Sequence, residues 1–514
     1  MPELARTLMI QGTASAVGKS LMVAALCRIF RRDGIRVAPF KAQNMALNSF
    51  VTSDGLEIGR AQAVQAEAAG IEPAVEMNPI LLKPEPGMRS QVVVMGKSRG
   101  SMTWPEYSRL KPEMRDVIAR SLQTLREKYQ LVVIEGAGSP AEINLTSDDI
   151  VNMHVARIAD APVVLVGDID RGGVFAQLVG TMELLAPADR ARIAGFIINK
   201  FRGEKSLLAP GLDFLAARFG VPVLGVVDQV DKLRIADEDS VALDDRPRRR
   251  RRLQEPPSSS IDIAVIRLPS IANFDDFVAL EHEPDVTLRF IFDVGEVRRA
   301  DLLVIPGSKS TVSDLKWLRR EFFVEEIVER AFHNRPILGI CGGCQMLGEW
   351  IEDPERVESK HRRTEGICLL PITTRFERGK LTAQVKARVA SPTFFGTAEE
   401  AGEISGYEIH MGRVERDDIA TAPFQIVARN GEPCTAADGA ISLDDVTVGT
   451  MIHGLFENDA LRAAMLRTLR KRKGIRAAGG PGAIASREAE YDRLAAAVRE
   501  QVDLAALQRI AGLI

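Results

Sequence analysis

The chain has 514 residues, enough for two or three domains. Hydrophobic residues make up 46% and charged residues 27%, a balance that excludes an intrinsically disordered protein. The net charge is −3, so nothing draws the whole molecule toward nucleic acid or an acidic membrane. Five cysteines are too few, and odd in number, for a disulfide framework. No apolar run is long enough for a transmembrane helix or a signal peptide. We therefore expect a soluble cytoplasmic enzyme.

The first half of the chain alternates short apolar runs with amphipathic segments. We predict buried strands at residues 7–10, 37–40, 131–134, 163–166, 194–198 and 221–226. The longer segments between them, for example 19–32 and 112–128, have the apolar spacing of helices. Buried strands that alternate with helices form a mostly parallel sheet flanked by helices. We therefore predict an α/β domain over residues 1–243.

The composition changes after this domain. Residues 244–260 read DDRPRRRRRLQEPPSSS and lack apolar periodicity, which predicts an interdomain linker. No aromatic residue is interleaved with the arginines, and this favours a solvated linker over a nucleic-acid patch. We predict a second α/β domain over residues 261–465 and a helical C-terminal extension over 466–514. The strands of this second domain are expected at residues 263–266, 288–291, 302–305, 337–340 and 448–452.

A phosphate-binding loop follows the first predicted strand. The segment GTASAVGKS lies between that strand and a helix, as such a loop requires. Backbone N–H groups around Gly12, Thr13 and Gly18 would face the phosphates of ATP. Lys19 would reach the β- and γ-phosphates, and the Ser20 hydroxyl would bind Mg²⁺. Five residues separate the two glycines, where four are usual. The loop predicts ATP and Mg²⁺ as cofactors.

The GT…VGKS form resembles dethiobiotin synthetase and related ATP-dependent amide-forming enzymes. The resemblance implies that Lys41 lies near the phosphates and that Asn199 contacts adenine. It also implies that Asp54 and Glu135 are further Mg²⁺ ligands. Glu135 ends a predicted strand, where α/β proteins bind ligands, and its oxygens suit Mg²⁺. A surface turn for Asp54 and an ordinary loop amide for Asn199 remain open alternatives.

A second polar cluster follows the strand predicted at 163–166. Asp168 and Asp170 stand there in the segment DIDRGG. Because ligands bind at the carboxyl ends of parallel strands, these two carboxylates are candidate contacts for the substrate or the γ-phosphate.

The segment PILGICGGCQML predicts a nucleophile elbow. An apolar strand ends at residue 340, Cys341 follows, and two glycines precede a helix. Small neighbours permit the strained turn that exposes the thiol, and the helix N-terminus favours the thiolate. The N–H of Gly342 would face an oxyanion. Cys344 is expected to pack inside the helix, and the other three cysteines to be structural.

The GxCxGxQ pattern around Cys341 resembles the class I glutamine amidotransferase signature. The earlier segment PGSK resembles the loop of that class in which Gly307 supplies the other oxyanion donor. The base should be a downstream histidine. We favour His453, which ends a predicted strand before a glycine, and we place His410 on the substrate side. Class I enzymes have His-Pro-Glu, but the glutamate position is Leu455 here. We therefore predict a Cys–His dyad without an orienting carboxylate.

A dethiobiotin-synthetase-like ATPase joined to a glutaminase without that glutamate resembles the cobyric acid synthase family. The resemblance runs nearly end to end and includes PFKAQNMALNS, DGLEIGRAQ, DIDRGGVFA, PGSKSTVSDL, GICGGCQMLG, GYEIHMGR and IHGLF. It implies a P-loop NTPase-like first domain and a flavodoxin-like class I glutaminase second domain. It also implies ATP- and glutamine-dependent amidation of the b, d, e and g carboxylates of cobyrinic acid a,c-diamide, with or without its adenosyl ligand.

Two other functions remain open. The a,c-diamide synthase has the same two domains and the same chemistry but amidates different carboxylates. A partitioning-type ATPase switch with a relic glutaminase domain would release no glutamate. Cytidine triphosphate synthase is excluded, because it would carry His-Pro-Glu. We expect glutamine and a corrinoid as binding partners, no nucleic acid or membrane, and a possible homo-oligomer.

Overall fold

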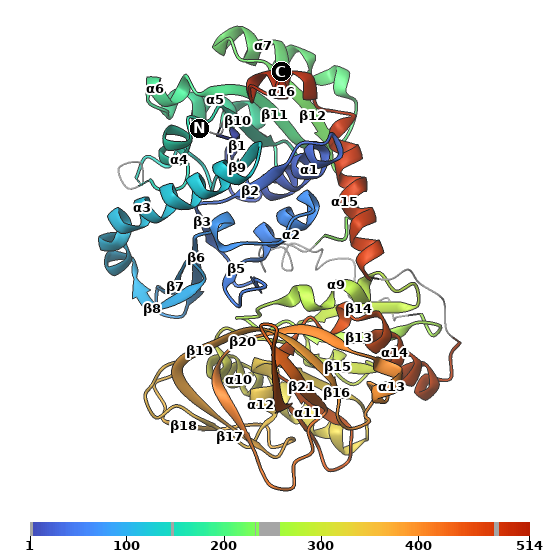
Figure 1. Cartoon of the computed structure of the whole chain (residues 1–514). Helices are drawn as coiled ribbons and strands as arrows, with labels where there is room; N and C mark the ends of the chain where they lie inside the picture. Colours follow the sequence, from blue (N-terminus) through green and yellow to red (C-terminus); the bar gives the residue numbers. More distant parts are fainter. Residues whose placement is uncertain (1–3, 145–148, 232, 236–256, 477–482) are drawn as a thin grey trace. The chain divides into compact units, whose positions relative to one another are not determined.

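The computed structural model describes residues 4–144, 149–231, 233–235, 257–476 and 483–514. The chain divides into two compact units (Figure 1). Unit 1 comprises the described residues of Met1–Ala46, Ile58–Glu238 and Arg487–Ile514, and unit 2 those of Leu47–Glu57 and Asp239–Ser486. Most of the predicted linker, residues 244–256, lies outside the described residues.

Unit 1 is built on a six-stranded parallel sheet with the order β12-β11-β10-β1-β9-β2. Its strands are β1 (Arg6–Gly12), β2 (Val37–Phe40), β9 (Leu131–Glu135), β10 (Val163–Asp168), β11 (Ile193–Phe201) and β12 (Val223–Asp228). Each strand predicted in the first half overlaps one of them. Because the strands run in parallel, the phosphate loop, Glu135 and Asp168 all lie at the carboxyl edge of one sheet.

Helices and a smaller sheet complete the first part of unit 1. The helices are α1 (Lys19–Arg32), α2 (Arg60–Ala69), α3 (Trp104–Lys128), α4 (Met153–Ala159), α5 (Val174–Leu184), α6 (Pro187–Arg190) and α7 (Ala209–Phe219). The smaller sheet contains β3 (Gln43–Met45), β6 (Ile80–Glu85), β7 (Arg89–Val94) and β8 (Lys97–Thr103). The helix predicted at 112–128 begins earlier, at Trp104. The reason is a capping box, in which the Glu106 carboxylate accepts from the Thr103 N–H at 2.7 Å.

The end of the chain belongs to unit 1. Helices α15 (Ala483–Arg499) and α16 (Leu504–Ile510) follow the unit 2 helix α14 (Asp459–Lys473), so the predicted boundary at residue 466 falls inside α14. Helix α15 lies beside α1 (Figure 1). There the buried Arg28 guanidinium contacts the carboxylates of Asp492 and Glu488, each at 2.7 Å.

Unit 2 has a mostly parallel sheet with the order β14-β13-β15-β16-β24-β23. Its strands are β13 (Ile261–Ile266), β14 (Val286–Ile291), β15 (Leu302–Ile305), β16 (Ile337–Ile340), β23 (Ala440–Ile441) and β24 (Thr447–Thr450), of which only β23 is antiparallel to its neighbour. Its helices are α9 (Val278–Glu281), α10 (Thr311–Arg320), α11 (Phe323–Phe332), α12 (Gly342–Leu347), α13 (Ala398–Ala401) and α14. The predicted fold class, two α/β domains with a helical tail, is confirmed.

A second, largely antiparallel sheet in unit 2 was not predicted. Its strands are β17 (Trp350–Glu352), β18 (Arg363–Glu365), β19 (Ile372–Val389), β20 (Ile404–Arg416), β21 (Phe424–Arg429), β22 (Glu432–Asp438) and β25 (Ile452–His453). The strand predicted at 448–452 is therefore wrong, since its residues divide between β24 and β25. Buried Asp438 fixes the break by accepting from the Thr450 hydroxyl at 2.5 Å and the Met451 N–H at 3.0 Å.

Within the part of the chain that the structure describes, no helix combines the length and the apolar character needed to cross a membrane.

The Arg28 contact gives a test of how α15 is held. Arg28→Ala should lower the free energy of unfolding by about 1–3 kcal/mol, because it removes a buried cation whose partners are only partly exposed. Arg32 contacts the same Asp492 but is 59% exposed. Arg32→Ala is the matched control and should cost less than about 1 kcal/mol. Denaturant unfolding of the full chain measures the free energy of unfolding of both variants. Equal losses would contradict the conclusion that the buried Arg28, more than Arg32, holds α15 against α1.

Candidate active sites

The phosphate loop of unit 1 has the backbone that its sequence predicts. Gly18 is left-handed, with φ of 99°, immediately before α1 begins, and a Cβ at Gly18 would lie 2.2 Å from the Asn199 amide nitrogen. That amide donates to the Val17 carbonyl at 2.9 Å. A Cβ at Gly12 would lie 2.5 Å from the Val17 side chain. The loop thus requires both glycines and lies against Asn199.

Glu135 is the centre of a polar cluster at the end of β9. Its Oε1 accepts from the Ser20 hydroxyl and from the Lys41 ammonium, each at 2.8 Å, and its Oε2 accepts from the Gln65 amide at 2.5 Å. Glu135 is 1% exposed, so the carboxylate needs these partners. The structure therefore brings together Ser20, Lys41 and Glu135, as predicted, and adds Gln65, whose helical position gave no signal in the sequence.

Lys19 and Thr13 lie in the same loop. The Lys19 ammonium donates to the carbonyls of Ala14 and Gly138, at 2.9 and 3.1 Å. Thr13 donates its hydroxyl to Gln177 at 3.0 Å. The lysine is thus held across the loop by two carbonyl oxygens, which a nucleotide phosphate can replace.

The two aspartates after β10 have different surroundings. Asp168 is buried and accepts from the Lys200 ammonium at 2.8 Å, and the same ammonium donates to the Ala16 carbonyl of the phosphate loop at 2.6 Å. Asp170 is more exposed and forms an ion pair with Arg202 at 3.4 Å. Lys200 therefore links Asp168 to the phosphate loop.

Asp54 belongs to unit 2. It lies in the turn between β4 (Ser49–Val51) and β5 (Glu57–Gly59), where it accepts from the Thr52 hydroxyl. Its role as a metal ligand stays a prediction. Among the described residues, no group of three or more His, Cys, Asp and Glu side chains is arranged to hold a metal ion.

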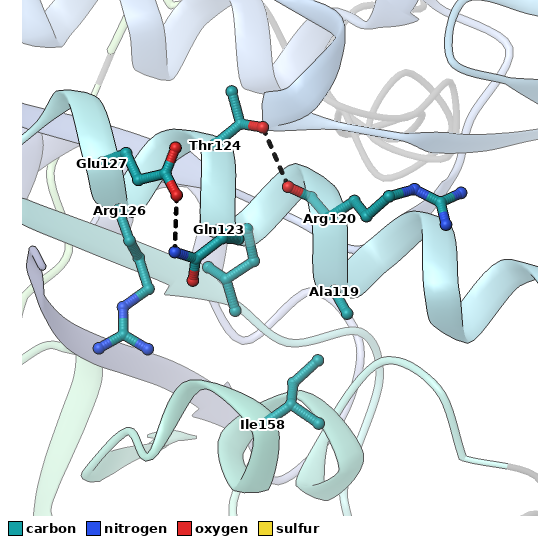
Figure 2. A pocket seen from close by; sticks show the side chains of 8 residues that line it. Ala119, Arg120, Gln123, Thr124, Arg126, Glu127 and Ile158 are labelled. Carbon is teal, nitrogen blue, oxygen red and sulfur yellow. Dashed lines mark hydrogen bonds between the residues drawn. The ribbon is translucent and has the colours of Figure 1, made fainter.

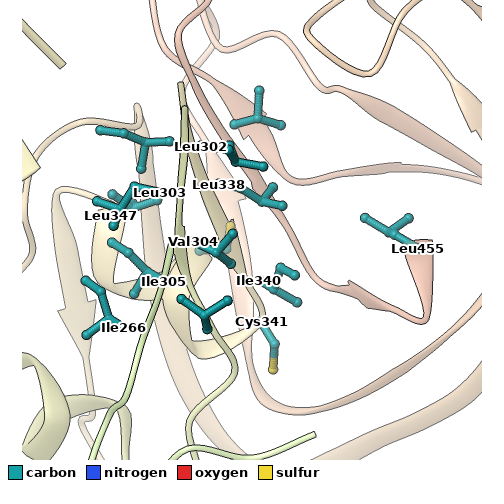
Figure 3. Packing of buried hydrophobic residues seen from close by; sticks show 14 of the residues in the cluster. Ile266, Leu302, Leu303, Val304, Ile305, Leu338, Ile340, Cys341, Leu347 and Leu455 are labelled. Atoms are coloured by element: carbon teal, nitrogen blue, oxygen red, sulfur yellow. The ribbon is translucent and has the colours of Figure 1, made fainter. Parts of the chain in front are cut away.

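In unit 2, Cys341 follows β16 with φ of 50° and ψ of −108°, the strained geometry of a nucleophile elbow. The strand packs among aliphatic side chains, and the sulfur points away from them (Figure 3). A Cβ at Gly343 would lie 1.9 Å from the Ile305 carbonyl, and one at Gly342 would lie 2.8 Å from the Ser308 N–H nitrogen. Only glycines therefore permit this turn against the loop that carries Gly307.

The His453 imidazole lies between this loop and a carboxylate. A Cβ at Gly307 would lie 3.0 Å from His453 Cε1. On the other side, His453 Nδ1 is 2.7 Å from Asp276 Oδ2, and Asp276 Oδ1 accepts from the Gly454 N–H at 2.8 Å. The expectation that His453 has no orienting carboxylate is therefore wrong. Asp276 comes from the 3₁₀ turn Phe274–Phe277, far upstream in the sequence, so no spacing from His453 could reveal it.

The electrostatics of Cys341 and His453 favour a thiolate–imidazolium pair. Burial raises the pKa of the Cys341 thiol, but the hydrogen bond and charge of His453, the charge of His410 and the Gly342 N–H together bring it below its ordinary value. Burial lowers the pKa of His453, but Asp276 and the thiolate raise it above its ordinary value. Nδ1 donates to Asp276, which leaves Nε2 for the sulfur.

His410 lies near the thiol as well, on β20. Its pKa is raised above its ordinary value, because the interactions with Glu408 and Cys341 outweigh burial. Glu408 is held by the Arg429 guanidinium at 2.6 and 3.0 Å. A second imidazole with a raised pKa therefore lies near Cys341. Cys344, by contrast, is fully buried, and burial raises its pKa well above the ordinary value, so it stays a thiol.

A surface hollow of about 570 Å³ lies in unit 1 between α3 and Ile158 of α4 (Figure 2). Two of its polar side chains are paired within the helix, since Thr124 donates to the Arg120 carbonyl and Gln123 to Glu127. None of the predicted site residues lines it. The hollow therefore has no part in the two candidate sites.

Comparisons with known proteins agree with this two-part arrangement. Residues 8–242 match the CobQ/CobB/MinD/ParA nucleotide binding domain, and residues 262–461 match the CobB/CobQ-like glutamine amidotransferase domain. Of the solved structures, that of PurLQS from Thermotoga maritima aligns with 41% of this chain and 99% of its own, with a TM-score of 0.32 and 19% identity. The matched domains define a nucleotide-dependent glutamine amidotransferase.

Full-length relatives define the family more closely. The chain is 60% identical over 519 residues to a cobyric acid synthase of Sorangium cellulosum, with 99% of each chain covered. It is 48% identical over 507 residues to one of Dehalococcoides mccartyi, with 98% of each covered. The chain therefore belongs to the cobyric acid synthase family, the ATP-dependent glutamine amidotransferases of cobalamin biosynthesis.

The Asp276 contact predicts the pH dependence of the thiol. In Asp276→Asn the imidazolium loses its carboxylate, so the pKa of His453 falls, the thiolate loses its cation, and the pKa of Cys341 rises. The acid limb of iodoacetamide alkylation at Cys341 should move to higher pH by about one unit or more. Glu457→Gln, which changes a carboxyl in the turn just after His453, is the control and should leave the profile in place. An unshifted profile in Asp276→Asn would contradict the proposed ion pair.

Proposed function

We propose that the chain amidates the b, d, e and g carboxylates of cobyrinic acid a,c-diamide, with or without its adenosyl ligand, to give cobyric acid. The observation that carries this proposal is the 60% identity to a cobyric acid synthase over nearly the whole of both chains. ATP and glutamine are the co-substrates. We further propose that the protein acts in the cytoplasm and binds neither nucleic acid nor membrane.

In unit 2, Cys341 is the proposed nucleophile and His453 the proposed acid and base. The thiolate adds to the amide carbon of glutamine, and the N–H groups of Gly307 and Gly342 stabilise the oxyanion. The His453 imidazolium gives its proton to the departing nitrogen, which leaves as ammonia, and a thioester remains. The neutral imidazole then takes a proton from water, whose oxygen attacks the thioester. Glutamate leaves and the thiolate is restored.

In unit 1, the proposed reaction is phosphoryl transfer from ATP to a substrate carboxylate. A carboxylate oxygen attacks the γ-phosphorus, ADP leaves, and an acyl phosphate forms. Ammonia then displaces phosphate to give the amide. Lys19 and Lys41 neutralise charge on the phosphates, and Gly12, Thr13 and Gly18 supply N–H donors. Asn199 contacts the adenine, and the substrate contacts that we propose in unit 1 are Asp168 and Asp170. His410, of unit 2, is a further proposed substrate contact.

The residues of the Glu135 cluster fit a magnesium ion. The Ser20 hydroxyl and the Glu135 carboxylate offer hard oxygen ligands 2.8 Å apart, the type that Mg²⁺ prefers. Lys41 and Gln65 meanwhile compensate the buried carboxylate. We propose Ser20 and Glu135 as ligands, with Asp54 as a third. When bound with ATP, the ion would neutralise phosphate charge during transfer.

Mass spectrometry of the corrinoid tests this function. Cobyrinic acid a,c-diamide is incubated with the enzyme, ATP and glutamine. Each exchange of a carboxyl OH for NH₂ lowers the mass by about 1 Da, and we expect four successive steps, since acyl transfer to ammonia replaces one group at a time. No decrease with this substrate would contradict the proposal. Two decreases with cobyrinic acid itself, and none with its diamide, would assign the a,c-diamide synthase instead.

Lys19→Ala tests the phosphate loop. Losing the cation that faces the β- and γ-phosphates should lower the amidation rate by about 10³-fold or more, whether glutamine or ammonia supplies the nitrogen. Glutaminase activity of the free enzyme, measured as glutamate release, is the control and should remain. Near wild-type amidation by this variant would contradict the assignment.

Cys341→Ala tests the division of labour between the units. The thiolate is needed only to release ammonia, so the variant should lose glutamine-dependent amidation and retain amidation with a high concentration of ammonium chloride. Cys344→Ala is the matched control. It should behave like wild type with both nitrogen sources, apart from a packing cost of about 1 kcal/mol. A folded Cys341→Ala protein that is inactive with both nitrogen sources would overturn the two-site scheme. If Cys344→Ala instead loses only the glutamine-dependent reaction, then Cys344 and not Cys341 is the nucleophile.

A further inference from the structure

The hairpin of residues 47–57 belongs to unit 2, although the residues on both sides of it belong to unit 1. Strand β4 of this hairpin pairs with β5, whose first residue, Glu57, ends the segment. Long strand β19 holds the hairpin through the Thr382 hydroxyl, which donates to the Gly55 carbonyl at 2.7 Å, and through the Lys380 ammonium, which contacts Glu57. A segment from within the ATP-binding half of the sequence is thus part of the glutaminase unit.

One side of the hairpin contacts Tyr407, the residue that stacks on the His453 imidazole. The Phe50 ring lies 5.9 Å from the Tyr407 ring, centroid to centroid, at an angle of 55°. Tyr407 in turn stacks on the His453 imidazole at 5.2 Å and 16°, and the two residues are cross-strand partners in β20 and β25. Val51 forms a small buried cluster with Tyr407 and Ile409. The hairpin therefore supports the tyrosine that covers the imidazole.

The other side of the hairpin contacts the start of the turn that carries Asp276, the carboxylate that orients His453. The Ser49 N–H donates to the Asn273 side-chain oxygen at 3.2 Å, and the Asn48 side-chain oxygen accepts from the Phe274 N–H at 3.4 Å. Asn273 is left-handed, with φ of 53°, and begins the 3₁₀ turn that carries Asp276. The hairpin therefore supports the start of this turn as well.

We propose that residues 47–57 are a positioning element for the His453 imidazole. Tyr407 restrains the face of the ring, and Asp276 restrains its Nδ1 edge. The hairpin contacts Tyr407 itself and the start of the turn that carries Asp276. An imidazole that must exchange a proton with a thiolate loses rate steeply when it is displaced by even 1 Å. The ATP-binding half of the sequence thus contributes directly to glutaminase geometry. The proposal rests on the proposed glutaminase function.

The hairpin is close in sequence to two residues of the proposed ATP site. Lys41 lies six residues before residue 47 and Gln65 lies eight after residue 57, and both side chains bind Glu135 at the proposed ATP site. The covalent path from that site to the hairpin is therefore short in both directions.

Phe50→Ala removes the ring that supports Tyr407, and Asn273→Gly removes the acceptor for Ser49 while glycine keeps the left-handed backbone. Each variant should lower kcat for glutamate release by about 10-fold to 100-fold, with KM for glutamine changed little. Each should also shift the acid limb of Cys341 alkylation to higher pH. Phe50→Tyr, which keeps the ring, should restore both measurements.

Phe332→Ala is the matched control, because Phe332 is 81% exposed on α11. The proposal is overturned if Phe50→Ala and Asn273→Gly both give the kcat and the alkylation profile of this control, or if they lower only the melting temperature. Wild-type protein that releases no glutamate from glutamine would instead overturn the proposed function on which the inference rests.

Discussion

The buried imidazole of His453 is the constraint on which the glutaminase unit depends. The ring is 2% exposed, so its charged form requires charges of the opposite sign against it. Asp276 Oδ2 lies 2.7 Å from Nδ1, and Asp276 together with the Cys341 thiolate raises the pKa of His453 above its ordinary value. Asp276 comes from a turn after β13, Cys341 follows β16 of the parallel sheet, and His453 ends β25 of the antiparallel sheet. Both sheets must therefore be formed before the pair exists.

The break between β24 and β25 is what brings the two sheets to one site. Asp438 holds this break by accepting from Thr450 and Met451, and the Cys341 N–H donates to the Thr450 carbonyl at 2.8 Å. The chain that leaves the parallel sheet beside the nucleophile thus enters the antiparallel sheet and presents the imidazole. Unit 1 has a comparable buried charge at Glu135, which the Lys41 ammonium balances at 2.8 Å.

The sequence predicted those features whose signal is local. Glycines around the phosphate loop and around Cys341 mark turns that admit no Cβ, and buried strands stand out as apolar runs. Contacts between distant segments had no such signal. Asp276 was missed because class I enzymes place the carboxylate two residues after the histidine, whereas here it comes from far upstream. The antiparallel sheet was missed because its strands alternate in exposure and β19, for example, is rich in charged residues.

The most direct test of this account is the protonation state of His453 in the resting enzyme. NMR of protein labelled in the histidine ring, with His453→Gln to assign the signal, reports whether the imidazole is charged. We predict that the wild-type ring is an imidazolium near neutral pH. In Cys341→Ala and in Asp276→Asn, the ring should lose its proton at a lower pH than in the wild type. A neutral wild-type imidazole that titrates like an isolated histidine, and that neither substitution changes, would contradict it.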